Sequence, residues 1–426
     1  MAGYRLMAGP RASAVFSWLP LAGCVLLCWP AQTDAQLLQG IPRSPIETMG
    51  GSTERIPQDF YVMPWIAAGV VYDDNVLFQT RDRRQDDVFS RVTPGLLASY
   101  QSTPLTVIAS YRFDWEEYSK LRNLSAGQQR QFGTLEFRGR PSSSWTLNNI
   151  LGFAQTRTPF ELNFLTSAQV ARIKTERFFV NPSTEYRIDA ATRLRGEYGY
   201  SKDIFGGEVD INSHTFTLGA ERRVGVHDWV GPAYIGRHFT FGGDVSGSFP
   251  GFLGGNPDAV TSHAFLVTWG HDFAADTRLD FRIGPRITNG SLDDRPETFL
   301  GLRRRFQGGE ATLAYTSAIT TVLGTVGSTR TDSLSLRLQY EPIKHLTLTA
   351  LPAAAWIKSN TFSSTIYTGY IEAAYQINKY LTAKGSAYFS YQEGDFSTTG
   401  GVSETLIIPR NVYWLRLEFT YPTRWE

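Results

Sequence analysis

Residues 330–341 read Arg-Thr-Asp-Ser-Leu-Ser-Leu-Arg-Leu-Gln-Tyr-Glu. Apolar side chains occupy alternate positions here, and on one side of an extended chain they are Leu334, Leu336, Leu338 and Tyr340. The positions between them are polar, namely Ser333, Ser335, Arg337 and Gln339. This two-residue period predicts a strand with one apolar and one wet face. A tilted strand of about 9–11 residues crosses a bilayer, so the stretch has the length and pattern of a transmembrane β-strand.

Similar stretches recur along the chain and predict about eighteen strands. They cover residues 60–72, 89–101, 104–116, 129–139, 144–156, 174–187, 191–202, 211–223, 228–241, 260–272, 277–288, 296–306, 309–318, 331–341, 345–358, 364–378, 380–392 and 409–421. A count of sixteen stays open, because 296–306 alternates poorly and 157–173 has room for an extra element. The predicted fold is all-β, a transmembrane antiparallel up-and-down β-barrel.

The connections between these strands alternate in length. Short ones, such as 101–103, 140–143 and 341–344, are followed by longer stretches rich in Gly, Asp and Ser, such as 117–128, 157–173 and 242–259. Short periplasmic turns alternating with long outer loops are typical of bacterial outer-membrane barrels. A β-propeller has a similar repeat of about 40 residues, but its four strands per blade are shorter than these.

The first 59 residues predict export and a lead-in to the barrel. Residues 1–35 combine two arginines, an apolar stretch from Ala14 to Leu27 and a small-residue exit, the parts of a cleaved secretory signal peptide. A lipoprotein box at Cys24 is the alternative, although the apolar run continues beyond it. Residues 36–59 are polar with scattered Pro and Gly, and we expect a periplasmic lead-in there; residues 60–426 form the predicted barrel. Both cysteines, Cys24 and Cys28, fall within the signal segment, so we expect no disulfide in the mature chain.

Composition narrows the class of function. The 41 basic and 40 acidic residues give a formal charge of +1, which provides no general attraction for nucleic acid. Apolar runs of about 18 residues do not occur after the signal, so helical spans are not predicted. Aromatic residues make up 13% of the chain, as expected where aromatic girdles mark both membrane interfaces.

Side chains on the face opposite the apolar one are expected to line the lumen. Its charged members are Arg112, Asp114, Glu136, Arg138, Arg193, Arg195, Glu197, Arg278, Asp280, Arg282, Arg337, Lys384, Arg416 and Glu418. Arg or Lys facing hydrocarbon near the midplane costs about 2–4 kcal/mol, which favours the inward side. Nine of these residues are cationic and five anionic. Two interpretations stay open: a water-filled channel that guides anionic or sugar-like solutes, and arginine–carboxylate ladders that brace the wall.

Motifs for catalysis or cofactors are not evident. The six histidines form no close pair at metal-ligand spacing, and no phosphate-binding glycine loop joins a strand to a helix. We therefore predict a non-enzyme without cofactor or metal. The sharpest local cluster, Tyr72-Asp73-Asp74-Asn75, has two interpretations. It is an outer-rim Ca²⁺ site, or a turn in which the side chains bond their own backbone, which we favour.

The same cluster carries a resemblance to a known family. A signal segment and short lead-in, then a first strand ending in Tyr72-Asp73-Asp74-Asn75-Val76-Leu77-Phe78 and regular hairpins to the end, resemble the β-barrel porin 2 family of Gram-negative bacteria. The resemblance covers most of the mature chain and implies an outer-membrane location. Since some members are linked to exopolysaccharide machinery, it also implies a role in polymer export, but no catalytic or ligand residue.

The predicted function is a channel that exports an extracellular polysaccharide across the outer membrane. The alternatives are a general diffusion porin for small solutes and, less favoured, a barrel enzyme or an adhesin that acts through its loops. Expected partners are outer-membrane lipid, the polysaccharide or solute in transit and a periplasmic polymer-export complex, without nucleic acid.

Overall fold

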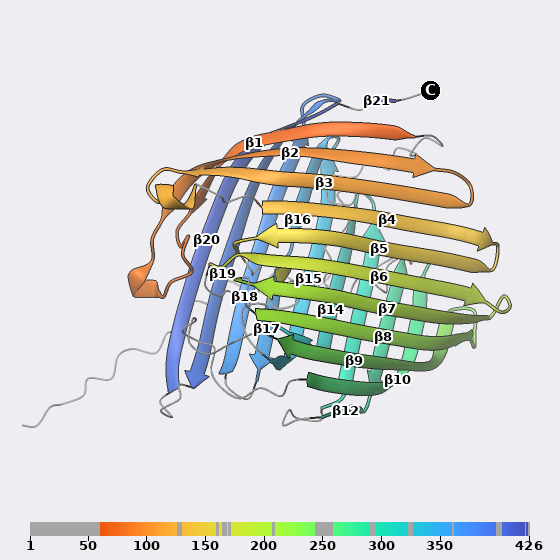
Figure 1. Cartoon of the computed structure of the whole chain (residues 1–426). Coiled ribbons are helices and arrows are strands. Elements are labelled where there is room, and N and C mark those ends of the chain that lie inside the picture. Colours follow the sequence, from red (N-terminus) through yellow and green to blue (C-terminus); the bar gives the residue numbers. More distant parts are fainter. Residues whose placement is uncertain are drawn as a thin grey trace, which may run out of the picture.

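The computed structural model describes residues 60–125, 130–158, 162–163, 168, 172–206, 209–242, 259–289, 295–322, 327–359, 362–397, 403–421 and 423–424. The predicted signal peptide and lead-in lie outside these residues. The described chain forms one antiparallel sheet that closes on itself as a barrel (Figure 1). Near and far strands cross at a steep angle in this view, as expected for strands that tilt in a barrel wall.

The strands follow one another around the barrel in chain order. They are β1 (Tyr61–Asp73), β2 (Asp87–Gln101), β3 (Leu105–Tyr118), β4 (Arg130–Ser142), β5 (Trp145–Thr156), β6 (Thr175–Arg187), β7 (Thr192–Phe205), β8 (Val209–Arg223), β9 (Asp228–Gly242), β10 (Ala259–Ala274), β11 (Thr277–Gly284), β12 (Arg286–Thr288), β13 (Glu297–Phe306), β14 (Gly309–Thr321), β15 (Ser328–Ile343), β16 (Leu346–Ala350), β17 (Ala353–Lys358), β18 (Phe362–Gln376), β19 (Leu381–Ser397), β20 (Ser403–Thr420) and β21 (Thr423–Arg424).

Prolines divide two of the transmembrane strands. Pro285 separates β11 from β12, and Pro352 follows the end of β16. Proline has no N–H to donate to the ladder, yet its carbonyl still accepts: Phe265 N–H donates to Pro285 at 3.1 Å and Leu336 N–H to Pro352 at 2.9 Å. Each pair of short strands therefore acts as one span.

The ring closes between the first and last strands. β1 pairs with β2 on one side and with β20 on the other, in a register that sets Ala67 opposite Glu418, and β21 continues the pairing at Tyr61. Because β11 with β12, β16 with β17 and β20 with β21 each form one span, the described barrel has eighteen strands. This confirms the predicted fold class and the count of eighteen over sixteen. Eighteen strands are enough to leave an aqueous interior unless something fills it.

The two faces of the wall separate as the two-residue period predicts. Leu334, Leu336, Leu338 and Tyr340 are all 37–40% exposed on the outer face. The same face carries Leu415, which is 73% exposed. A barrel whose exposed outer face is apolar is stable when lipid hydrocarbon surrounds it and unstable in water. No helix in the described part of the chain is long and apolar enough to cross a membrane.

The two ends of the barrel differ. At one end, here called the turn end, neighbouring strands are joined by short links such as 102–104, 143–144 and 307–308. At the other, called the loop end, the connections include 74–86, 119–129, 157–174 and 243–258. One-turn helices η1 (Arg81–Arg83) and η2 (Arg122–Leu124) lie in the first two of these loops. The predicted alternation of short and long connections is therefore present.

Candidate functional site

The register of the strands places all fourteen predicted lumen residues on the inner face, opposite the exposed apolar side chains. They come from β3 (Arg112, Asp114), β4 (Glu136, Arg138), β7 (Arg193, Arg195, Glu197), β11 (Arg278, Asp280, Arg282), β15 (Arg337), β19 (Lys384) and β20 (Arg416, Glu418). A closed wall brings side chains from distant parts of the sequence into one interior. Ion pairs between neighbouring strands decide what that interior presents.

One group of charges spans β2 to β4. Asp114 and Glu116 are buried on β3. Glu116 is 2.6 Å from Nη2 of Arg91 on β2. Arg130 on β4 binds Asp114 and lies 3.7 Å from Glu116. Arg112 lies over the ring of Phe132, 4.8 Å from its centroid. Two buried carboxylates thus share several guanidinium groups, which compensates the cost of removing them from water.

A second group lies near the turn end, from β6 to β9. Arg193 Nη2 is 2.5 Å from Glu221 of β8, and Arg195 Nε is 3.2 Å from Glu185 of β6. Arg195 also approaches Glu221 at 3.4 Å. The guanidinium of Arg193 lies 4.4 Å from the centroid of the Trp229 ring on β9. Two arginines and two carboxylates form a closed network with an aromatic platform beside it.

A third group sits at the seam between the last strands. Lys384 Nζ is 2.8 Å from Glu418 across β19 and β20, and both side chains are buried. Arg416 lies 3.1 Å from Glu372 of β18. Glu372 also accepts hydrogen bonds from the hydroxyls of Tyr370 and of Ser386, at 2.7 and 3.1 Å. These contacts tie three consecutive strands together on the inner face.

The remaining predicted residues have local partners. Arg278 is 2.5 Å from Asp280 and 4.0 Å from Asp272. Arg138 is 3.7 Å from Glu136. Arg282 lies 5.3 Å from the ring centroid of Phe299, Arg337 Nη2 donates to Gln339 at 3.4 Å, and Glu197 pairs in register with Thr217. Both uses of the charges, bracing the wall and lining a polar interior, thus fit the geometry.

Sequence reasoning missed many other charged residues of the inner face that form ion pairs, in these networks or elsewhere. They are Arg91, Glu116, Arg130, Arg177, Glu185, Asp203, Glu221, Arg237, Arg286, Glu297, Glu310, Glu372 and Arg410. Each occupies a polar position of the two-residue period, so a complete reading of every strand would have included it. Six of these residues are cationic and seven anionic, so a small excess of cations remains when they are added to the fourteen.

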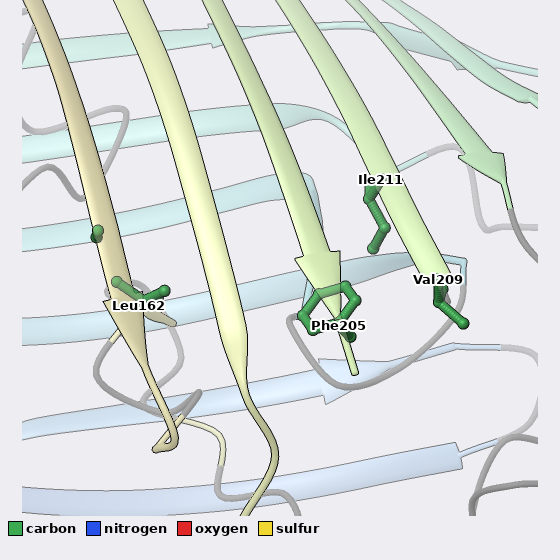
Figure 2. Close-up of a cluster of buried hydrophobic side chains, with 5 residues drawn as sticks. Leu162, Phe205, Val209 and Ile211 are labelled. Atoms are coloured by element: carbon green, nitrogen blue, oxygen red, sulfur yellow. The ribbon is translucent and has the colours of Figure 1, made fainter. Parts of the chain in front are cut away.

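The loop between β5 and β6, residues 157–174, has described residues that are buried against the inner wall. Leu162 is 2% exposed and belongs to a buried cluster that also contains Ala154 of β5, and Phe205, Val209 and Ile211 on the inner face of β7 and β8 (Figure 2). Arg177 of β6 fixes this point: Nη1 donates to the Leu162 carbonyl at 3.0 Å while the same guanidinium pairs with buried Asp203 at 2.5 Å. The loop is therefore anchored by apolar burial and by a charged hydrogen bond.

Farther along, the same loop reaches other parts of the wall. Ala168 is 3% exposed and packs in a cluster with Val322 and with Ala355, Ile357 and Ile366 of β17 and β18. In the closed ring, β17 and β18 lie almost opposite β7 and β8. The described residues of this loop thus belong to buried clusters on nearly opposite parts of the inner wall.

Arg172 makes the third contact of this loop. Nη2 donates to the Tyr118 hydroxyl at 2.7 Å and lies 3.7 Å from Glu116. Nη1 donates to the Val76 carbonyl at 3.4 Å. The loop therefore rests on the carboxylate cluster of β2–β4 before it rejoins the wall at β6. At the loop end, the described residues of this loop therefore make buried contacts with the inner wall at Leu162, Ala168 and Arg172.

The Tyr72–Asn75 cluster forms a turn. Asn75 N–H donates to the Asp73 carboxylate at 3.0 Å, as in an Asx turn. Asp73 is also 2.6 Å from Arg410, and Asp74 accepts from Asn411 Nδ2 at 2.7 Å. These carboxylates are engaged by protein donors, which favours the turn over the Ca²⁺ site. Among the described residues, no group of three or more His, Cys, Asp or Glu side chains is arranged to hold a metal.

Comparison with known proteins gives similar architectures at low sequence identity. No family model matches the chain and no curated protein sequence matches it, so the resemblance to the porin 2 family is not confirmed. Solved structures that match include OccK8 (OprE) of Pseudomonas aeruginosa, at 10% identity and a TM-score of 0.41 over 86% of this chain and 99% of that one. OpdO of the same species matches at 8% identity and a TM-score of 0.43, over 86% of this chain and 98% of that one. The siderophore receptor PirA of Acinetobacter baumannii matches at 7% identity and a TM-score of 0.43, over 86% of this chain and 81% of that one.

Those scores are too low to transfer any property, and the assignment rests on the chain itself. A closed antiparallel sheet, a continuous apolar exterior and a charged interior together define an outer-membrane β-barrel. The chain folds as an outer-membrane β-barrel.

Proposed function

We propose that this protein is a non-enzymatic outer-membrane channel that exports an extracellular polysaccharide, with the 157–174 loop as its constriction. The observation that supports this most is the loop that touches nearly opposite walls at Leu162 and Ala168. A loop held across a wide barrel reduces conduction at rest and provides an element that can move when a solute passes. The loop end faces the cell exterior in this proposal, and the turn end faces the periplasm.

The chemistry of the inner face supports a sugar polymer. Aromatic rings lie beside cations on the wall, with Phe132 next to Arg112 and Trp229 next to Arg193. The apolar face of a sugar ring packs on such rings, while its hydroxyl and carboxylate groups bond to arginine and glutamate. Weak contacts repeated along a wall let a polymer slide without being trapped. A general diffusion porin is the second candidate, since a charged, constricted lumen also suits small solutes.

Planar-bilayer recording with the purified protein tests the channel. We expect discrete conductance steps, and linear polysaccharide added on the turn-end side is expected to block the current in brief events. An anionic polymer and a neutral polymer of equal length separate charge from stacking. A barrel that gives no steps even after the 157–174 loop is shortened contradicts the channel itself.

Export is tested in cells. Deleting the gene should abolish surface polysaccharide, as seen by staining, while uptake of small solutes is unchanged. The opposite pattern, with normal polysaccharide and impaired solute uptake, would favour the general porin. Trp229→Ala should weaken polymer block without changing the open conductance for salt by more than about twofold, because stacking is worth about 1 kcal/mol. Trp145→Ala on the outer face is the matched control, since its indole is 42% exposed there.

A further inference from the structure

The outer face of the barrel changes character at the loop end of β15, β17, β18 and β19. Register aligns the outward residues of these strands in rows. The lower row consists of Leu334, Ala354, Tyr367 and Tyr391, in which the tyrosines are 48% and 39% exposed. These side chains continue the apolar exterior, and exposed tyrosines are typical of the interface girdle.

The next two rows toward the loop end are polar and charged. The first contains Asp332, Trp356, Thr365 and Glu393, and the second contains Arg330, Lys358, Ser363 and Asp395. They surround a hollow of about 330 Å³, to which Arg295 also contributes. Six charged residues thus border the hollow, whereas the row just below it is apolar and aromatic.

The side chains in the hollow offer three kinds of contact. Arg330 is fixed by Asp332 at 2.6 Å, with 9% of its side chain exposed, and Lys358 is exposed beside it. Trp356 is 41% exposed and forms an aromatic wall. Glu393 and Asp395 are exposed acceptors, with the hydroxyls of Tyr391 and Thr405 as their donors at 3.5 and 2.5 Å. Cations suit phosphate, carboxylates accept from sugar hydroxyls, and an aromatic ring covers apolar surface.

We propose that this hollow binds the headgroup of a phosphorylated glycolipid in the membrane leaflet around the loop end. Arg330, Lys358 and Arg295 hold the phosphate, Glu393 and Asp395 accept hydrogen bonds from sugar hydroxyls, and the acyl chains run down the apolar rows below. The hollow is large enough for a headgroup, since ligand pockets measure about 300–1,000 Å³. This inference relies on the proposed function only for the orientation in which the loop end lies in the outer leaflet.

Native mass spectrometry of the purified barrel in detergent tests the proposal. The probes are lipid A with both phosphates, the same lipid with its phosphates removed, and inorganic phosphate as competitor. We expect the wild type to retain phosphorylated lipid A. Lys358→Gln and Arg330→Gln should each weaken retention about tenfold, the usual loss for one charged hydrogen bond. Lys358→Arg should restore it.

Lys202→Gln is the matched control. Lys202 lies on the outer face at the loop end of β7, paired with Asp210 at 3.2 Å and outside the hollow. It should retain lipid as the wild type does. Folding of every variant is checked by the shift in gel mobility on heating, and Lys358→Gln changes an exposed side chain, so it keeps the test valid if Arg330→Gln does not fold.

Three results would overturn the proposal. Equal retention of the dephosphorylated lipid removes the role of phosphate. Competition by millimolar inorganic phosphate identifies a free-anion site instead of a lipid site. Retention that Lys358→Gln and Lys202→Gln affect alike shows that lipid associates with the outer face in general. Conductance recorded on the same preparation keeps the two proposals separate, because a silent barrel that binds lipid contradicts only the channel.

Discussion

Truncating Leu162 should release the 157–174 loop from the wall. The side chain is 2% exposed in a buried cluster that extends to Phe205, Val209 and Ile211, and burial of a leucine contributes about 1.5–3 kcal/mol. Because 1.4 kcal/mol corresponds to a tenfold change in an equilibrium constant, Leu162→Ala should lower the ratio of docked to undocked loop by roughly 10- to 150-fold. The hydrogen bond from the Arg177 guanidinium to the Leu162 backbone carbonyl does not depend on the leucine side chain, so the loop keeps this anchor.

Single-channel recording measures this release. Wild-type channels should show a steady low conductance, whereas the variant should visit a higher level more often and for longer. Leu415→Ala is the control, because it makes the same chemical change at a position 73% exposed on the outer face. Identical dwell times for Leu162→Ala and the wild type, with the variant shown to be folded, would refute the idea that this contact holds the loop.

Two further changes probe the wall itself. Arg177→Met leaves the Asp203 carboxylate, which is 0% exposed, without its guanidinium partner; it should destabilise the barrel by about 3–5 kcal/mol in urea unfolding. Arg187→Gln, which breaks an exposed pair with Glu185, should cost about 0–1 kcal/mol, and equal losses would contradict the role of burial. Gly95→Ala adds a Cβ that overlaps the Trp65 indole, so it should cost about 1–3 kcal/mol and change tryptophan fluorescence. Gly219→Ala, whose Cβ meets its nearest neighbours at 3.8 Å, should leave both measurements nearly unchanged.

Residues far apart in the chain explain why the site was only partly predictable. Arg193 and Arg195 were predicted to face inward from the period of one strand, and the register sets them opposite Glu221 and Gly219 of β8. Their partners Glu185 and Glu221 lie on the two neighbouring strands. Pairing them requires the register of three strands, which the turn lengths do not specify to a single residue. The set of charged lumen residues predicted from the sequence was incomplete for that reason.

The loop shows the other boundary of sequence reasoning. Residues 157–174 carry no periodicity, so the sequence does not show where so long a connection runs. Ala168 is too small to signal an anchor by itself; it is buried because Ala355, Ile357 and Ile366 present an apolar patch at a position almost opposite the loop's origin. The row of Arg330, Lys358, Ser363 and Asp395 likewise becomes one surface only when four strands align.

The sequence by itself determined that the chain is a barrel of about eighteen strands, which side of most strands is apolar, and the order of short and long connections. These follow from a two-residue period and from turn chemistry, both of which act between neighbours in the chain. Only the tertiary structure decided which loop has residues buried against the inner wall, which carboxylate meets which arginine and where charges interrupt the apolar exterior. Those contacts join residues separated by tens or hundreds of positions, and ring closure brings them together.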